Sequence, residues 1–238
     1  MKKYIFFDMD NTLSRSRTEV TPTMSSLIKK LAVDHEVIVV SGASAKQIAF
    51  QIGKGLSGKY WVLGQNGNIC IDKSGNVFWE NKMDWLQKLE VLDYARKVID
   101  AKIFPYKSKT DLVDDRGCQI SLSIYGHTQP VSMKETIDPK QKIRQMILKK
   151  FPFRSKGVEV KIAGTTCLDF FIKGKNKGSN VAELYKKMKW KKSECLYVGD
   201  ALYKNGNDET VVGIIPTQAV CDPSDTEDVI RKLLVDTK

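Results

Sequence analysis

The sequence predicts an α/β fold in which a Rossmann-like parallel sheet is interrupted by an inserted α+β module. Over residues 1–82 and 175–238, short β-branched or aromatic runs alternate with amphipathic helical patterns, which is typical of a parallel sheet covered by helices. Over residues 83–174 the expected strands outnumber the helices between them, which favours an antiparallel sheet. A chain of 238 residues is also long enough for two domains, since domains commonly hold about 100–150 residues.

The first 82 residues supply the opening strands of the parallel sheet. Residues 4–7 form a short apolar run that ends at acidic side chains. Thr21 and Pro22 provide a capping hydroxyl followed by proline at the first helical position, so we expect a helix from there to residue 32. The remaining elements expected in this segment are a strand at 37–40, a helix at 45–52, a strand at 60–63 and small strands at 69–71 and 77–79.

The middle of the chain carries the inserted module, and the end returns to the first pattern. Residues 83–99 have helical periodicity, and Asp138-Pro139 begins a second helix that reaches residue 150. The strands expected in the module are 112–113, 119–124, 158–162 and 167–172. After residue 174 we expect a helix at 179–188, strands at 195–198 and 211–214, and a helix at 226–234.

Positive charge is concentrated in one part of the sequence. The chain has 39 Lys and Arg against 28 Asp and Glu, a formal net charge of +11. Residues 134–192 hold 17 Lys and Arg and 5 Asp and Glu, a net charge of +12, so the rest of the chain has −1. A basic surface attracts anions, which makes phosphorylated metabolites and nucleic acid candidate partners. Aromatic residues do not alternate with these lysines as in a base-stacking surface, so nucleic acid is the weaker candidate.

The five cysteines indicate a reducing compartment. They are odd in number, widely spaced and without a C-x-x-C pair, which argues against a disulfide framework and against a zinc site. No apolar run approaches the roughly 20 residues that span a bilayer, and acidic residues soon interrupt the apolar N-terminal run. We therefore expect a cytoplasmic protein without membrane segments. The sequence does not indicate its oligomeric state.

Two carboxylates and a hydroxyl stand directly after the first expected strand. Asp8, Asp10 and Thr12 occupy alternate positions there. Ligands of open α/β sheets bind beyond the carboxyl ends of the strands, so a site is expected at this place. One carboxylate can bind a divalent cation and attack phosphorus, and the second can move the proton of a leaving group or of water. The structural alternative is a helix cap or an Asx turn at the strand end.

Residues 8–12 read D-x-D-x-T and resemble the first motif of the haloacid dehalogenase superfamily. Three further motifs follow in the order that the family has. They are Ser41-Gly42 at the end of the second strand, Lys177-Gly178 at a helix start after the module, and residues 197–209, an acidic loop after a later strand. Each of these pairs is common by itself, whereas four motifs in order, each at the end of a strand or helix, are specific.

The resemblance implies a role for each motif. Asp8 would be the nucleophile that forms an aspartyl-phosphate, and Asp10 would act first as the general acid and then as the base. The phosphate-binding residues that it implies are Thr12, Ser41, Gly42 and Lys177. The implied cofactor is Mg²⁺, held by Asp8, the backbone carbonyl of Asp10 and Asp200, with Asn207 and Asp208 orienting its waters. The implied substrate contacts are Asn66 and, from the inserted cap domain, Arg116 and Asp169.

The inserted module is similar to that of the subgroup with a large α/β cap, which includes Cof-type phosphatases and eukaryotic-type phosphomannomutases. The resemblance makes residues 1–82 and 175–238 the catalytic core and residues 83–174 the cap that selects the substrate. Residues 164–171 and Asn66-Gly67 are similar to substrate-side segments of phosphomannomutases. Two positions depart from the pattern: Asn11 stands where the first motif usually has glycine, and His127 where an arginine is expected.

We therefore expect a Mg²⁺-dependent phosphatase of small phosphorylated metabolites, first of all sugar phosphates, that works through an aspartyl-phosphate. The alternative is a phosphomannomutase-like mutase, in which a bound sugar phosphate replaces water as the acceptor of the phosphoryl group. A third hypothesis is a nucleic-acid-binding protein on a catalytically inactive scaffold. The intact set of Asp8, Asp10 and Asp200 disfavours it.

Overall fold

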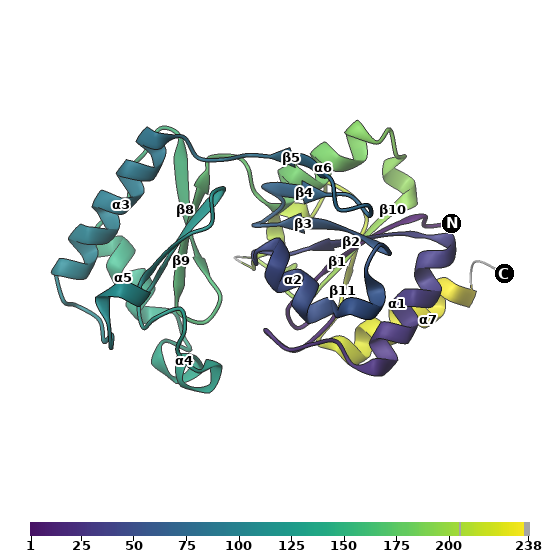
Figure 1. The fold of residues 1–238 in the computed structure, drawn as a ribbon, viewed down its shortest axis with the longest axis horizontal. Coiled ribbons are helices and arrows are strands. Elements are labelled where there is room, and N and C mark those ends of the chain that lie inside the picture. The colour runs from purple at the N-terminus through teal and green to yellow at the C-terminus, as the bar shows by residue number, and fades with distance from the viewer. Residues whose placement is uncertain (205, 236–238) are drawn as a thin grey trace. The chain divides into compact units, whose positions relative to one another are not determined.

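The computed structural model describes residues 1–204 and 206–235 and divides the chain into two compact units. The core unit consists of Met1–Glu80 and Lys175–Lys238, and the inserted unit of Asn81–Gly174 (Figure 1). From the sequence, the boundaries were expected after residues 82 and 174, so the first lies two residues later than in the structure.

The described residues of the core unit form a seven-stranded sheet with the strand order β11-β10-β1-β2-β3-β4-β5. The first five strands of this order run parallel to one another, and the pairings of β4 with β3 and with β5 are antiparallel. The strands are β1 Tyr4–Asp8, β2 Glu36–Val40, β3 Tyr60–Gly64, β4 Ile69–Ile71, β5 Val77–Glu80, β10 Cys195–Gly199 and β11 Thr217–Ala219. The expected α/β fold with a parallel core sheet is thereby confirmed.

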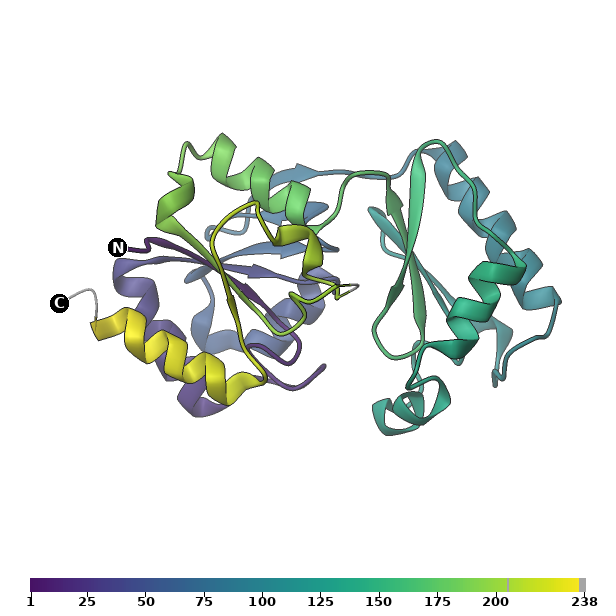
Figure 2. The same ribbon diagram turned by 180° about the vertical axis from the view of Figure 1, so that it is seen from behind.

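Helices cover both faces of the core sheet (Figures 1 and 2). The helices are α1 Pro22–Asp34, α2 Ala45–Ile52, α6 Lys177–Lys187 and α7 Pro223–Val235, with short 3-10 helices η1 Lys54–Leu56, η3 Lys192–Glu194 and η4 Glu209–Val211. Ile5 and Phe7 of β1 pack with α1, α2 and α7, whereas Phe6 packs on the other face with α6. Because both faces are buried, the central strands are continuous apolar runs rather than alternating ones.

The inserted unit is a four-stranded antiparallel sheet with the order β6-β7-β9-β8. Its elements are α3 Trp85–Asp100, η2 Lys109–Asp111, β6 Val113–Asp115, β7 Gln119–Ser123, α4 Val131–Ile137, α5 Lys142–Lys150, β8 Val158–Ala163 and β9 Cys167–Ile172. Ile120, Leu122 and Phe170 pack against α3 and α5 on one face of this sheet. Ser121 pairs with Asp169 across β7 and β9, and since side chains alternate along a strand, the opposite face is polar.

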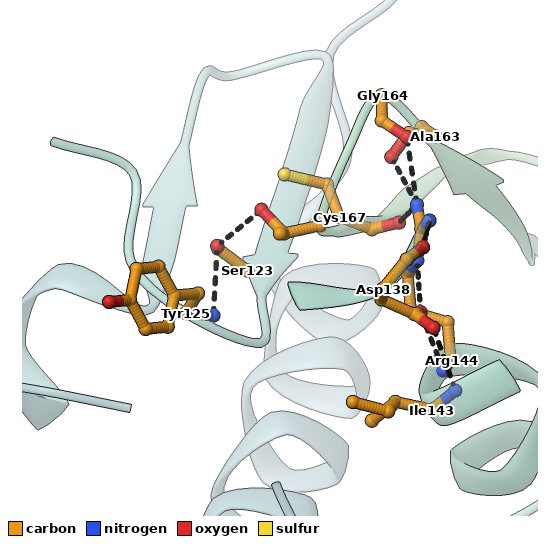
Figure 3. Close-up of polar contacts among 9 residues, drawn as sticks. Ser123, Tyr125, Asp138, Ile143, Arg144, Ala163, Gly164 and Cys167 are labelled. Atoms are coloured by element: carbon orange, nitrogen blue, oxygen red, sulfur yellow. Dashed lines mark hydrogen bonds and ion pairs between the residues drawn. The ribbon is translucent and has the colours of Figure 1, made fainter. Parts of the chain in front are cut away.

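A buried ion pair between Arg144 and Asp138 lies at the start of α5, beside the turn between β8 and β9 (Figure 3). The Arg144 side chain donates to Asp138 Oδ2 at 2.9 Å, and both side chains are 2% exposed. The same guanidinium donates to the carbonyl oxygens of Ala163 and Gly164, each at 2.9 Å, at the turn between β8 and β9. The backbone N–H groups of Ile143 and Arg144 donate to the Asp138 carboxylate, which thus also caps α5.

Two expected elements differ from the structure. The prediction of a strand at 211–214 is wrong, because Val211 is the last residue of the 3-10 helix η4. Gly213 has φ +83°, a left-handed conformation that turns the chain, so these residues do not form an extended strand. The helix expected from Asp138 starts at Lys142 instead, because Asp138 supplies the side chain that caps it. Helix α4 was not expected from the sequence.

The structure also describes the helices with respect to a membrane and the state of the cysteines. None of the helices within the described residues has the length and apolar character needed to cross a membrane. All five cysteines are free, and all but Cys221 are buried.

Candidate active site

The first two motifs lie at the carboxyl edge of the core sheet. Asp8 is the last residue of β1, and its backbone is in register with Val40, the last residue of β2. Ser41 and Gly42 therefore follow β2 at the same edge. Asp200 directly follows β10, the other neighbour of β1. Parallel strands bring together residues that are separated by up to 192 positions in the sequence, which is why ligands bind at such edges.

Lys177 joins two of the acidic residues. Its Nζ donates to Asp8 Oδ1 at 2.5 Å and to Asp208 Oδ1 at 2.7 Å, and all three side chains are at most 2% exposed. Lys177 is the first residue of α6, whose start is set by a capping box between Asn176 and Ser179. This cap holds the helix end, and with it the lysine, against the acidic residues.

Tyr197 supports Asp208 from within β10. Its hydroxyl donates to Asp208 Oδ1 at 2.7 Å, and the tyrosine is fully buried. Close approach here requires glycine: a Cβ on Gly199 would lie 2.5 Å from Asp208 Oδ2, and one on Gly178 would lie 1.8 Å from the carbonyl oxygen of Thr210. Tyr197 was not expected as a site residue from the sequence, since an aromatic residue in a buried strand has no distinguishing pattern.

The donor set suits a hard divalent cation. Asp8, Asp200 and Asp208 can each offer one oxygen, with these oxygens within 4.8 Å of one another. Lys177 donates to the Oδ1 atoms of Asp8 and Asp208. The Oδ2 atoms of both carboxylates are buried and, among the described residues, have no hydrogen-bond partner. Unpaired buried carboxylate oxygens are unfavourable without a cation, and Mg²⁺ prefers oxygen ligands. The residues present therefore fit this metal.

The shifted pKa values of this cluster also indicate that a cation would be stabilised here. Burial, and next the nearby Asp208, raises the pKa of Asp8 well above its usual value, although Lys177 opposes this. Burial also raises the pKa of Asp200, with Asp208 adding to the effect. Burial by itself would lower the pKa of Lys177, but Asp208 and Asp8 outweigh it and raise that pKa. Three carboxylates thus share one ammonium group, and a second cation would relieve their repulsion.

Asp10 is held by the loop that follows β1 and by α2. Its Oδ1 accepts from the backbone N–H of Arg17 at 2.8 Å and from Gln51 Nε2 at 3.1 Å. Asn11 has φ +60°, the left-handed conformation that favours glycine and that asparagine also tolerates, which accounts for asparagine at this position of the motif. The Asn11 side chain also hydrogen-bonds Asp200 and lowers its pKa, against the larger effect of burial.

Gln51 is a second residue of the site that was not expected from the sequence. It lies on α2 between Ile48 and Ile52, and all three are buried. A polar residue on the buried stripe of a predicted amphipathic helix is the sequence signal that identifies it.

The expected phosphate-side residues also lie in the core unit. Thr12 is fully buried, and within the described residues its Oγ1 has no hydrogen-bond partner. Ser41 Oγ accepts from the backbone N–H of Ala43 at 3.0 Å, and the carbonyl oxygen of Ser41 accepts from the N–H of Asn66 at 2.8 Å. A Cβ on Gly42 would lie 3.5 Å from Asn66 Oδ1, so the Asn66 amide lies beside this glycine.

Two residues that were expected at the metal site, Asn207 and Asp10, do not share in the group of carboxylates formed by Asp8, Asp200 and Asp208. Asn207 is exposed, and its neighbour Asn205 in the same loop lies outside the described residues. The Asp10 carboxylate is not part of the group formed by Asp8, Asp200 and Asp208, and the role of the Asp10 backbone carbonyl as a metal ligand stays a prediction.

The expected substrate residues of the inserted unit lie on its polar sheet face. Asp169 is buried and accepts from Ser121 Oγ at 2.6 Å. Burial raises the pKa of Asp169, and Arg116 is the largest effect that opposes this. The Arg116 side chain donates from Nε to Asp114 Oδ2 at 2.7 Å. His127 lies nearby and donates from Nε2 to the carbonyl oxygen of Ser121 at 3.0 Å, and burial lowers its pKa.

Comparisons with known proteins agree with the fold. Residues 5–116 match the family model of haloacid dehalogenase-like hydrolases. The phosphomannomutase of Spinacia oleracea is 27% identical over 231 residues, covering 92% of this chain and 91% of that protein. The phosphomannomutase of Triticum aestivum is 25% identical over 241 residues, covering 92% and 90%.

Solved structures share the fold at low identity. The SMU.1108c protein of Streptococcus mutans has a TM-score of 0.72 and 17% identity, covering 99% of this chain and 100% of that one. A haloacid dehalogenase-like hydrolase from Bacteroides thetaiotaomicron has a TM-score of 0.67 and 13% identity, covering 98% and 100%. The N-terminally truncated IMP-nucleotidase of Plasmodium falciparum has a TM-score of 0.67 and 18% identity, covering 98% and 70%.

Proposed function

We propose that this chain, whose residues 5–116 match the family model of haloacid dehalogenase-like hydrolases, is a Mg²⁺-dependent phosphatase of small phosphorylated metabolites, in particular sugar phosphates. The observation that carries this proposal is the buried cluster in which Lys177 joins Asp8 to Asp208 while an oxygen of each carboxylate stays without a partner among the described residues. Such a cluster offers a nucleophile, a cation for the phosphoryl group and oxygens for a metal in one place.

In the first step, a carboxylate oxygen of Asp8 attacks phosphorus and the bond from phosphorus to the leaving oxygen breaks. Asp10 gives its proton to the leaving oxygen, which departs as a neutral alcohol. Lys177, Thr12, Ser41 and Gly42 are proposed to hold the oxygens of the transferring group. Fixed donors of this kind supply much of the catalysis of phosphoryl transfer, because little covalent chemistry is left to the protein.

In the second step, water attacks the phosphorus of the aspartyl-phosphate and gives a proton to Asp10. The bond between phosphorus and the Asp8 oxygen breaks, which releases inorganic phosphate and restores both carboxyl groups to their starting states. Lys177 stays beside the Asp8 oxygen and stabilises the carboxylate as it reappears.

Asp8, Asp200 and Asp208 are proposed to hold Mg²⁺, with the Asp10 carbonyl directly and Asn207 through water. The metal would supply positive charge that neutralises the phosphoryl oxygens and the surrounding carboxylates.

The inserted unit is proposed to select the substrate, and its charges favour a monophosphate. The cations nearest to Asp169 and His127 have partners: Arg116 pairs with Asp114, and Lys134 donates to the carbonyl oxygen of His127. His127, with its lowered pKa, adds no positive charge at neutral pH. A sugar that carries one phosphate, bound through hydroxyls here, suits this balanced face better than a second phosphate.

The second candidate is a mutase, which the sequence similarity to phosphomannomutases favours. A hexose bisphosphate assay separates the two. A mutase interconverts the 1- and 6-phosphates without net phosphate release, and the bisphosphate activates it. A phosphatase releases inorganic phosphate from either isomer and does not need the bisphosphate.

The test of the main proposal is a screen of phosphorylated metabolites with Mg²⁺, scored by phosphate release. We expect turnover of sugar monophosphates that chelation abolishes and Mg²⁺ restores. The Asp8→Asn variant should fold and lose turnover, because an amide is not a nucleophile and is a poorer metal ligand. More than about a tenth of the wild-type rate in this variant would rule out the aspartyl-phosphate, since covalent catalysis requires the carboxylate.

A further inference from the structure

A buried amide on α2 contacts the loop that carries the proposed acid–base residue. Gln51 is fully buried although it is polar. Burying an amide is unfavourable unless it is hydrogen-bonded, so its partners indicate what it is for. Among the described residues, its side chain contacts polar groups of α2 and of the loop after β1.

The Gln51 side chain reaches the loop at two points. Its Nε2 donates to Asp10 Oδ1 at 3.1 Å and lies 3.4 Å from Ser14 Oγ. Its Oε1 accepts from Gln47 Nε2, one helical turn earlier, at 3.4 Å, which orients the amide so that its NH₂ group faces the loop. The backbone carbonyl of Gln51 accepts from the N–H of Val20 at 2.8 Å, so one residue holds both the start and the end of this loop.

These contacts distinguish the two oxygens of Asp10. Oδ1 accepts from Gln51 Nε2 and from the N–H of Arg17, and neither of these bonds involves Oδ2. An oxygen that faces two donors cannot itself carry a proton toward them. The proton of a protonated Asp10 therefore belongs on Oδ2.

We propose that Gln51 is a positioning residue that fixes the Asp10 carboxyl with Oδ1 turned to the protein and Oδ2 turned to the reacting oxygens. This inference rests on the proposed function, in which Asp10 protonates the leaving group and then deprotonates water. Without the Gln51 amide, the carboxyl can rotate about its last side-chain bond, and the proton-bearing oxygen is less often in place. Misplacement of a catalytic group by about 1 Å can cost about 10²-fold in rate.

The test replaces the amide by an apolar side chain of similar length. We expect Gln51→Met to lower the single-turnover phosphorylation rate with a hexose 6-phosphate by about 10–100-fold, with little change in KM. With para-nitrophenyl phosphate the same step should slow by less than about threefold, since that leaving group needs no proton. The matched control is Phe50→Met on the same helix, at a side chain that is 56% exposed and takes no part in these contacts, and it should keep the wild-type rate with both substrates.

A double-mutant cycle separates positioning from a purely structural role. In an Asp10→Asn background, Gln51→Met should have no further effect on the hexose phosphate rate, because the group that it positions is gone. Equal losses for both substrates, or an undiminished loss in the Asp10→Asn background, would overturn the inference. If Asp10→Asn itself keeps the wild-type rate, the acid–base role in the proposed function fails. If Asp10→Asn is inactive while Gln51→Met is normal, only the role of Gln51 fails.

Where Gln51→Met lowers the melting temperature, Gln51→Asn provides the second variant. It keeps the amide but shortens the side chain by one methylene, and it should show the same selective loss with the hexose phosphate. Recovery of the wild-type rate by this shorter amide would contradict a role that depends on reaching Asp10.

Discussion

At the scale of single residues, the site depends on placing one lysine between two buried carboxylates. Removing water from charged groups is costly, and the Lys177 cluster offsets this through short ion pairs to Asp8 and Asp208 and the Tyr197 hydroxyl. Gly178 and Gly199 permit the close approach, because any side chain there would overlap the opposing groups. The same arrangement leaves two carboxylate oxygens for a cation.

The first prediction concerns the counter-ion. Lys177→Met should abolish turnover and lower the metal-free free energy of unfolding by about 3–5 kcal/mol, because it leaves buried carboxylates without their cation. Mg²⁺ should recover part of the stability but none of the turnover. Chemical denaturation with and without Mg²⁺ measures this.

The matched control for this variant is Lys175→Met. Its ion pair with Glu183 is partly exposed, at 35% and 23%, and its loss should change stability by no more than about 1 kcal/mol. Equal stability changes for the two lysine variants would contradict the role assigned to Lys177.

The second prediction concerns pH. Burial lowers the pKa of His127 below its ordinary 6.5, so near that pH the unfolded chain binds a proton that the folded protein does not. Its contribution to stability is therefore present above about pH 6.5 and is lost as the pH falls below it. His127→Gln lacks this effect. The stability of the wild type relative to the variant should fall between pH 7 and pH 5 in denaturant titrations, and a constant difference would count against a buried neutral imidazole.

At the scale of elements, one buried arginine joins three parts of the inserted unit. Arg144 lies on α5, its partner Asp138 precedes that helix, and the carbonyl groups that it binds belong to the β8–β9 turn (Figure 3). The turn leads directly into β9, which carries Asp169. The ion pair thus supports the strand that presents a proposed substrate contact.

The third prediction tests that support. Arg144→Leu should lower the free energy of unfolding by about 3–5 kcal/mol, since it leaves the Asp138 carboxylate buried without its cation. The control is Arg96→Leu, which breaks a pair with Asp93 whose members are 73% and 54% exposed. Exposed pairs of this kind have a median contribution of about 0–1 kcal/mol, so this control should stay close to the wild type in denaturation. A small effect of Arg144→Leu would mean that the turn is held in another way.

The elements also show where local pattern is a reliable guide. The helix at Ala45–Ile52 and the strands at Ile69–Ile71 and Cys167–Ile172 have the expected bounds, because caps, turns and alternation are local properties. The strand expected at 211–214 is wrong because β-branched residues favour a strand only where a neighbouring strand pairs with them, and here Gly213 turns the chain.

At the scale of the whole molecule, the basic stretch of the sequence is divided between the two units. Residues 134–174 lie in the inserted unit and 175–192 in the core unit. Three of its cations, Lys134, Arg144 and Lys177, are buried with partners of their own. These three of the 17 cations in residues 134–192 therefore add no charge to the exposed surface.

The fourth prediction tests whether the inserted unit selects the substrate while the core unit carries out the reaction. Asp169→Ala and Arg116→Ala should lower kcat/KM for the preferred sugar phosphate, and barely change it for a small generic phosphate ester that needs no contact with the inserted unit. A melting curve accompanies both measurements. Uniform loss for all substrates together with a lower melting temperature would show instead that these residues are structural.

The sequence by itself determined the α/β class and placed Asp8 and Asp10 at a strand end, because strand ends and caps are encoded over a few neighbouring residues. Lys177 and Asp208 became site candidates through the resemblance of the four motifs, taken in order, to those of the superfamily. Only the tertiary structure decided which of these side chains meet, since Lys177 and Asp8 are 169 positions apart. It also revealed Tyr197 and Gln51, whose partners lie on other elements. Contacts of this kind depend on how strands and helices pack, and packing depends on the whole chain rather than on local pattern.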